Sequence, residues 1–264
     1  MTRFRLGSLF GIDLFLHWSF FLLLSWAGYQ GYAEGGRAGA VFVVLLVCAV
    51  FLCVVLHELG HSLAARKFGV PTLSITLYPI GGVARLGFIP RNPRQELFIA
   101  IAGPAVNFAI AAVLTPIVFL VGLPDWNGTG DPPYELSTFL MAITTCNVVM
   151  ILFNLIPAFP MDGGRVLRSL IAWKGRYVLA TTIAARLGQL MAFAFVVAGS
   201  GFIPGWDFRP TLMLIGGFIF FAAESERKAA KYYFFPDFSP QPPPIPPPVR
   251  TVIIGPDEWE VHPR

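Results

Sequence analysis

The sequence predicts an all-α polytopic membrane protein with about six transmembrane helices and a small membrane-associated β-hairpin. Of its 264 residues, 55% are hydrophobic and only 13% are charged, which lies outside the composition of ordinary soluble domains. The apolar residues form several runs long enough to cross a bilayer as helices, which takes about 20 residues each. Short polar or Gly/Pro-rich breaks separate these runs, so we expect the chain to cross the membrane repeatedly.

Six apolar runs are expected as membrane-spanning helices. They cover residues 13–33, 38–66, 95–122, 136–157, 177–203 and 209–232. A shorter segment, 164–176, mixes basic with aliphatic residues and is expected to form an amphipathic helix at the membrane surface. The first run has no convincing small-residue cleavage site, so we expect a retained span rather than a signal peptide.

The β-hairpin is expected within residues 70–93. β-branched residues alternate with other residues there, around a Pro/Gly break at 79–82, and this pattern is typical of two short strands. Because lipid-exposed strand edges are not tolerated, the hairpin must lie at the membrane surface or line a cavity within the protein.

The distribution of basic residues predicts the orientation. With the N-terminus inside, nearly all Lys and Arg residues of the short loops lie on the cytoplasmic side, and only Arg37 and Arg209 lie opposite. Positive residues are retained in the cytoplasm, so both termini are expected there, most simply across the plasma membrane. The basic residues form no groove-like cluster with aromatic residues, and nucleic acid is not expected as a partner.

One membrane domain is expected over residues 1–235, followed by a Pro-rich tail over residues 236–264. The tail holds ten of the 23 prolines and is expected to be extended and disordered in the cytoplasm. It is interpreted either as a partner-binding segment or as a disordered end. Cys48, Cys53 and Cys146 lie in apolar runs and are expected to be small buried hydrophobes.

The second run contains the motif His57-Glu58-Leu59-Gly60-His61. At helical spacing the two histidines project from one face toward a single metal ion, and Glu58 is placed to act as a general base. The motif also occurs by chance on surface helices. Here it lies inside an apolar helix, where ionisable groups are costly and mark function.

A catalytic zinc needs a third protein ligand besides the two histidines. Asp162 is the best candidate, because prolines and glycines break the fourth run around it, and unwound backbone at membrane depth must be buried or face water. The alternative interpretation is that Asp162 is a turn or helix-capping residue before Gly163-Gly164.

Three motifs, in this order, resemble the site-2 protease family. They are His57-Glu58-x-x-His61, Ala102-Gly103-Pro104-Ala105-Val106-Asn107, and Asn154-x-x-Pro157-x-x-Pro160-Met161-Asp162-Gly163-Gly164-Arg165. The opening Gly11-Ile12-x-x-x-x-His17-Trp18-Ser19 resembles the six-span branch, which includes a protease that processes a sporulation sigma factor. Many members carry PDZ domains or a pair of cystathionine-synthase-type (CBS) domains, and neither is expected here.

The resemblance implies an intramembrane zinc metalloprotease with one Zn2+ per chain, held by His57, His61 and Asp162, with Glu58 as the catalytic base. It also implies active-site asparagines, for which Asn107 and Asn154 are candidates that would bind the substrate backbone or the oxyanion. For Asn107, a bond between neighbouring helices is an equally good interpretation. His17 is better interpreted as an interfacial or packed residue beside Trp18.

The expected function is therefore hydrolysis of transmembrane protein substrates within the lipid bilayer. Two alternatives stay open: a membrane metal-binding or transport protein, and an inactive protease-like scaffold. A transporter needs no carboxylate beside the first ligand and would show further polar residues or internal repeats. Association into a homo-oligomer is compatible with the sequence, which does not identify a substrate.

Overall fold

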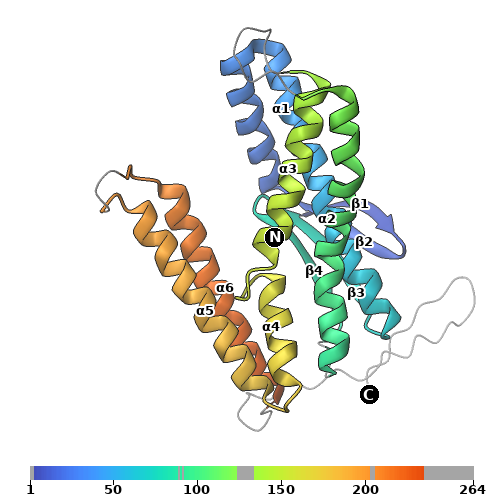
Figure 1. Ribbon diagram of the computed structural model, residues 1–264, viewed down its shortest axis with the longest axis vertical. Helices are drawn as coiled ribbons and strands as arrows, with labels where there is room; N and C mark the ends of the chain where they lie inside the picture. The colour runs from blue at the N-terminus through green and yellow to red at the C-terminus, as the bar shows by residue number, and fades with distance from the viewer. Residues whose placement is uncertain (1–2, 89, 91, 124–133, 203–205, 235–264) are drawn as a thin grey trace, which may run out of the picture.

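The computed structural model describes residues 3–88, 90, 92–123, 134–202 and 206–234, and the predicted Pro-rich tail lies outside them. The described elements are helical apart from one small sheet (Figure 1). They are β1 (Arg3–Leu9), β2 (Ile12–His17), α1 (Ser19–Lys67), β3 (Thr72–Tyr78), β4 (Gly81–Leu86), α2 (Pro93–Val121), α3 (Leu136–Asn154), α4 (Asp162–Ala172), α5 (Tyr177–Gly199) and α6 (Pro210–Phe234).

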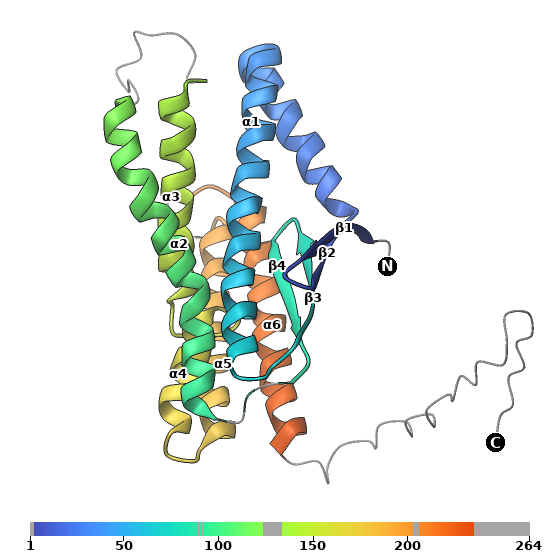
Figure 2. The ribbon, with the colours of Figure 1, turned by 90° about the vertical axis from the view of Figure 1, so that its right-hand side faces the viewer.

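Four helices of the described chain, α1, α2, α3 and α5, are long and apolar enough to cross a membrane. The 49-residue α1 is not one straight helix, because Gly35 and Gly36 have non-helical dihedral angles. Its two limbs, 19–34 and 37–67, meet at this kink and diverge from it toward the sheet (Figure 2). They approach so closely that a Cβ on Gly31 would lie 2.5 Å from the carbonyl oxygen of Gly39.

The first predicted span was placed too early, because residues 12–17 form a strand and α1 begins only at Ser19. The predicted hairpin is present as β3 and β4, but it is half of a four-stranded sheet in the order β1-β2-β3-β4. The central pair, β2 and β3, is parallel, and the two outer pairs are antiparallel. Pairing between β2 and β3 joins segments separated by the whole of α1, which a local sequence pattern does not reveal.

The sheet packs one face against α1. This inner face supplies Ile12, Leu14, Leu16, Ile75 and Leu77, which form a buried cluster with Phe20, Val55 and Leu59 of α1. Side chains alternate between the faces of a strand. His17, Thr76 and Tyr78 therefore belong to the opposite face, which we call the outer face of the sheet.

A tight turn separates α3 from α4. Gly163 and Gly164 pack against the backbone of residues 155–159, where a Cβ on Gly163 would lie 2.2 Å from the carbonyl oxygen of Ile156. The backbone N–H of Phe159 donates to the carbonyl oxygen of Ala184 at 3.0 Å, which ties the turn to α5. Asp162, the first residue of α4, is thereby held at a defined place.

The amphipathic helix expected over 164–176 corresponds to α4, but its basic residue Arg168 does not face water. Arg168 is only 2% exposed, and its guanidinium donates to the buried carboxylate of Glu96 on α2 and to Glu226 on α6. Burial alone would lower the pKa of Arg168, and the two carboxylates raise it above its ordinary value. Arg168 is therefore an interhelical residue and not a marker of topology.

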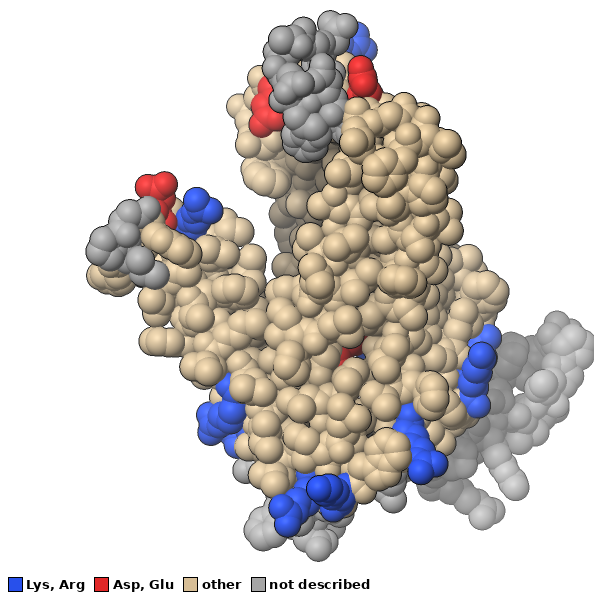
Figure 3. All heavy atoms as spheres, viewed as in Figure 1, with Lys and Arg blue, Asp and Glu red and all other residues tan. Residues whose placement is uncertain are grey.

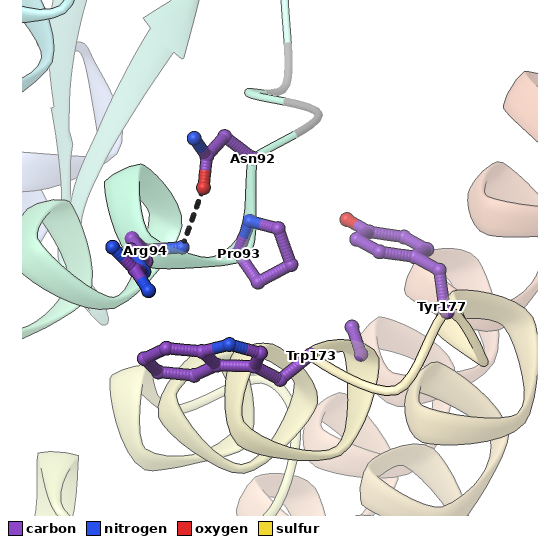
Figure 4. A pocket seen from close by; sticks show the side chains of 7 residues that line it. Asn92, Pro93, Arg94, Trp173 and Tyr177 are labelled. Carbon is purple, nitrogen blue, oxygen red and sulfur yellow. Dashed lines mark hydrogen bonds between the residues drawn. The ribbon is translucent and has the colours of Figure 1, made fainter.

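The start of α2 is fixed beside the turn between α4 and α5. Asn92 caps α2 by accepting a hydrogen bond from the backbone N–H of Arg94, and Pro93 occupies the first turn (Figure 4). The guanidinium of Arg94 lies over the ring of Trp173, 5.0 Å from its centroid. These side chains and Tyr177 surround a pocket of about 330 Å³.

Basic side chains gather at the lower end of the molecule in Figure 3, whereas the upper end carries acidic side chains together with basic ones. We call one the basic end, where α1 and α4 end and α2 begins; the residues next to these helix ends include Arg66, Lys67, Arg94, Lys174 and Arg176. We call the other the acidic end, where the limbs of α1 meet and α3 and α6 begin; the residues there include Glu34, Glu135 and Asp207. Toward the acidic end, α5 and α6 stand apart from α1, α2 and α3, whereas at the basic end they pack against α4 (Figures 1 and 3).

Candidate metal centre

His57 and His61 lie one helical turn apart in the second limb of α1, and both are buried, at 4% and 5% exposure. Their Nε2 atoms are 3.1 Å apart. This is the expected result of an i, i+4 pair on one helix face. The structure therefore places two imidazole nitrogens side by side inside an apolar helix bundle.

Asp162 reaches the two histidines from α4. Its Oδ2 lies 3.1 Å from the Nε2 atom of each ring, and the three residues form the group of potential metal ligands found in the described part of the chain. Burial alone would raise the pKa of Asp162, but the adjacent imidazoles, when they are protonated, outweigh burial and lower that pKa well below its ordinary value. An ionised carboxylate is the form that ligates a metal.

The spacing of these three atoms fits a zinc ion. Zn2+ is bound at about 2.0–2.1 Å by nitrogen and carboxylate oxygen in tetrahedral geometry, which sets neighbouring ligand atoms about 3.3 Å apart by simple trigonometry on those lengths. The observed separations are all 3.1 Å. Two imidazoles and one carboxylate also leave a fourth position open, as catalytic zinc sites do.

The other ring nitrogens favour the tautomers that metal binding needs. The Nδ1 of His61 lies 2.7 Å from the carbonyl oxygen of Ile99, which can only accept, so this nitrogen carries the proton. The Nδ1 of His57 lies 2.5 Å from the Oδ1 of Asn107, which accepts in the same way. Each Nε2 is then left with its lone pair directed at the site.

Asn107 is itself held by a second asparagine. Its Nδ2 donates to the Oδ1 of Asn147 on α3 at 2.7 Å, and the Nδ2 of Asn147 donates to the carbonyl oxygen of Ile143 at 2.9 Å. Both asparagines have no exposed surface. This chain fixes the orientation of the Asn107 amide, because the atom facing Asn147 is the donor and the atom facing His57 is the acceptor.

Two glycines let α2 approach the histidines. A Cβ on Gly103 would lie 2.2 Å from the Nε2 of His61 and 2.7 Å from that of His57. On the facing helix, a Cβ on Gly60 would lie 2.8 Å from the carbonyl oxygen of Ala102. Small residues at a helix crossing allow close backbone contact, and here any larger side chain at position 103 would occupy the metal site.

Glu58 lies next to the sheet. It follows His57 on α1, and β4 passes beside it at Gly82, where a Cβ would lie 2.7 Å from the Cγ of Glu58. The strand β4 therefore lies beside Glu58, the carboxylate residue that directly follows His57 in the sequence. Glycine at position 82 provides the space for that side chain.

The remaining predicted residues lie in different places. Asn107 contacts His57, as described. Asn154 is the last residue of α3, is half-buried, and forms no side-chain hydrogen bond to any described residue. His17 lies on the outer face of the sheet against Tyr78, with ring centroids 5.0 Å apart, and does not join the metal centre.

Three features were not predicted from the sequence. They are the hydrogen bond of Asn147 to Asn107, the close contact of Gly103 with the two histidines, and the buried ion pair between Arg168 and Glu96. Asn147 lies in an apolar helix, and an amide side chain at such a position could have indicated a hydrogen bond between helices. Glu96 at the start of α2 gave no comparable signal, because an acidic residue in a first helical turn is ordinary.

A buried His-His-Asp centre inside a bundle of apolar helices defines a class of membrane metalloproteins. Residues 45–124 and 131–199 match Peptidase family M50. The chain belongs to this family.

Two relatives carry informative names. A zinc metalloprotease of Methanocaldococcus jannaschii is 38% identical over 227 residues, which cover 86% of this chain and 61% of the relative. The solved structure of a site-2 protease from the same organism superposes with a TM-score of 0.59 at 35% identity, covering 86% of this chain and 95% of that chain. The present chain thus spans about three fifths of the length of the first relative.

Proposed function

We propose that this chain is an intramembrane zinc metalloprotease, hydrolysing peptide bonds in or near the transmembrane segments of membrane proteins. The observation that carries the proposal is the triangle of His57 Nε2, His61 Nε2 and Asp162 Oδ2, with 3.1 Å between each pair. The relatives named as a zinc metalloprotease and a site-2 protease support the same assignment.

His57, His61 and Asp162 would hold one zinc ion per chain. When bound, zinc polarises the scissile carbonyl and makes water nucleophilic near neutral pH. Glu58, adjacent to the first ligand, takes the proton of the attacking water and delivers it to the leaving amine. The buried surroundings exclude bulk water, so that only water admitted with the substrate takes part.

The two candidate asparagines have different proposed roles. Both polar atoms of the Asn107 amide already contact His57 and Asn147, so we assign Asn107 to orienting the first ligand. Asn154 has a half-buried amide without a described hydrogen-bond partner. We assign Asn154 to the substrate, where its N–H group donates to the oxyanion that forms during attack.

A helical substrate must unwind before it is cut, because its carbonyl groups are held in internal hydrogen bonds. In the described sheet, β4 is an edge strand and lies beside Glu58 at Gly82. An unwound substrate segment would pair with this edge by strand addition. Pairing there would bring the scissile bond next to the base.

The membrane arrangement is also a proposal. Counting the two limbs of α1 separately, with α2, α3, α5 and α6, gives six spans within one domain over residues 1–235. The concentration of Lys and Arg at the basic end supports a cytoplasmic location for that end and for both termini. The bilayer would be the plasma membrane.

The test compares wild-type protein with Glu58→Gln, both purified in detergent and incubated with a panel of single-span membrane substrates. Zinc is measured in the same preparations. We expect both forms to retain zinc, since Glu58 is not among the three ligand residues, and only wild type to cleave.

Cleavage at equal rates by both forms would refute the proposed mechanism. Bound zinc with no cleavage of any substrate in the panel by wild type would favour a metal-binding or transport role. A metal content near zero in wild type, after loading with zinc, would refute the metal centre itself.

A further inference from the structure

The outer face of the sheet carries a pocket that the proposed protease chemistry does not use. Its volume is about 350 Å³, and it is lined by Arg3, His17, Thr76, Tyr78, Val83 and Arg85. These residues come from all four strands. They lie on the side of the sheet opposite to Leu77, which packs against α1 near the metal centre.

The charged groups of this pocket are cationic and lack carboxylate partners. Among the described residues, neither Arg3 nor Arg85 forms an ion pair, whereas the neighbouring Arg5 is paired with Asp13 at 2.7 Å. The guanidinium of Arg3 lies over the ring of Phe15, 4.2 Å from its centroid, which limits its orientations. An unpaired guanidinium presents a planar set of donors suited to an oxyanion.

The neutral residues of the pocket add further donors. The backbone N–H of Ser19 donates to the Nδ1 of His17 at 3.3 Å, and the hydroxyl of Ser19 lies 2.6 Å from the same atom. Because Nδ1 accepts, the ring proton is on Nε2, which becomes a donor. With the hydroxyls of Thr76 and Tyr78, the described residues of the lining offer two cations and three neutral hydrogen-bond donors, and none of these residues is acidic.

The position of the pocket relative to the hydrocarbon layer indicates which kind of anion can reach it. His17 lies two residues before Ser19, where the first limb of α1 begins, and this limb runs from the sheet to the acidic end (Figure 2). Sixteen helical residues span about 24 Å, and the hydrocarbon layer is about 30 Å thick. Phe20, at the start of this limb, packs on Phe51 in the middle of the second limb. A hydrocarbon layer that begins at the acidic end would therefore end about 6 Å beyond the pocket, on the side of the basic end.

The surroundings of the pocket fit this depth. Large apolar side chains next to it are exposed, namely Phe4, Trp18, Phe21, Ile80 and Val83. Aromatic residues such as Trp18 are enriched at membrane interfaces. Exposed apolar groups would contact acyl chains, while the two arginines would contact the headgroup layer.

We propose that this pocket binds the phosphate group of a phospholipid from the leaflet at the basic end. Arg3 and Arg85 hold the phosphate oxygens, His17 Nε2, Thr76 and Tyr78 donate to them, and the acyl chains lie along the exposed apolar side chains. Arg85 belongs to β4, the strand that borders Glu58 at Gly82. A bound headgroup would thus fix the level of this strand relative to the membrane.

The test is lipid binding by the full chain in detergent, measured by native mass spectrometry after delipidation and titration with phosphatidylglycerol. We expect the Arg3→Gln/Arg85→Gln variant to bind the lipid at least tenfold more weakly than wild type. The matched control is Arg5→Gln/Lys67→Gln, which removes the same charge from the same end of the molecule outside the pocket. The control should stay within about twofold of wild type, because a few scattered charges contribute little.

Equal weakening by both double variants would overturn the site, since it would reflect net charge alone. Two competitors identify the recognised group. Diacylglycerol with the same chains should not displace the lipid, and displacement would show that acyl contacts alone are bound. Inorganic phosphate at millimolar concentration should not displace it either, and displacement would show a site for soluble phosphate rather than for lipid.

If the Arg3→Gln/Arg85→Gln variant folds poorly, a more conservative variant can test the same site. Arg3→Lys/Arg85→Lys retains both charges but loses the planar donor pairs, and an intermediate loss of about threefold to tenfold in affinity is expected. Affinity equal to that of wild type would contradict recognition by the guanidinium groups. Lipid binding is measured without a substrate, so its outcome does not depend on the proposed proteolysis.

Discussion

At the scale of single residues, the metal centre depends on side chains that do not contact the metal position. His57 can offer its Nε2 only if its Nδ1 is protonated, and the Oδ1 of Asn107 enforces this. Asn107 is oriented in turn by Asn147 on a third helix. A side chain of similar volume at position 107 that lacks a hydrogen-bond acceptor would leave the imidazole of His57 free to rotate or to change tautomer.

The first residue-scale prediction is that Asn107→Leu weakens zinc binding about 10- to 100-fold, the usual effect of removing such a partner. Zinc affinity is measured by competition with a chelator of known affinity. Asn154→Leu is the control, because Asn154 forms no described bond to a histidine. Loss of cleavage with unchanged zinc affinity in the Asn154 variant would support its assignment to the oxyanion. Unchanged zinc affinity in the Asn107 variant would contradict its orienting role.

The second residue-scale prediction concerns Gly103. Replacing it by alanine places a methyl group 2.2 Å from the Nε2 of His61, so α2 or the ring must move. We expect Gly103→Ala to lose most of its bound zinc and its activity. Gly217→Ala on α6 is the matched control, because its Cβ would meet nothing within 4 Å. Normal zinc content in the Gly103 variant would show that the helices separate easily at this crossing.

At the scale of elements, α4 links the candidate metal ligand Asp162 to the helices α2 and α6. Its first residue is Asp162, and its seventh is Arg168, which binds Glu96 on α2 and Glu226 on α6. The position of the third candidate ligand is thus coupled to a buried ion pair about ten ångströms along the helix, at 1.5 Å per residue. The glycines after Asp162 let the preceding turn pack on this helix.

The element-scale prediction is that Glu96→Gln destabilises the fold by about 3–5 kcal/mol, because it leaves the buried Arg168 charge without its main partner. Unfolding in mixed micelles measures the free energy. The double variant Glu96→Leu/Arg168→Leu should recover much of the loss, since it removes both charges. Arg227→Met is the control, because its ion pair with Glu224 lies at the surface, where solvent screening leaves such pairs little effect on stability. A loss for Glu96→Gln no larger than that of the control would refute a structural role for the pair.

At the scale of the whole molecule, charge and shape define two different ends. Basic side chains surround the end where α4, α5 and α6 pack together, and acidic ones mark the end where α5 and α6 stand apart from α1, α2 and α3 (Figure 3). Two of the three candidate metal ligands, His57 and His61, lie in the last part of α1, closer to the basic end. Under the proposed activity and orientation, a substrate cut there would release its fragment on the cytoplasmic side.

The molecule-scale prediction tests this orientation. In a background without the three native cysteines, Lys174→Cys and Asp207→Cys place exposed thiols at the basic and acidic ends. In intact cells a membrane-impermeant maleimide should label position 207, and position 174 should react only after permeabilisation. The reverse pattern would invert the proposed topology. Labelling of both positions in intact cells would place them on the same side and contradict the span count.

The sequence by itself determined the features that depend on local spacing or on composition. Membrane embedding follows from apolar runs, and the pairing of His57 with His61 follows from helical periodicity. Most helix ends were predicted to within a few residues because polar or Gly/Pro breaks mark them. The predicted start of the first span was wrong. Residues 12–17 are mainly apolar, like a membrane-spanning helix, but they form the strand β2.

Only the tertiary structure decided which distant residues meet. It placed Asp162 within 3.1 Å of both histidines, turned Asn107 toward His57, and buried Arg168 against Glu96. It also joined β2 to β3 across the whole of α1. Each of these contacts is made between segments far apart in the chain, and the free energy that selects them comes from packing helices and strands together, which no local pattern of residues records.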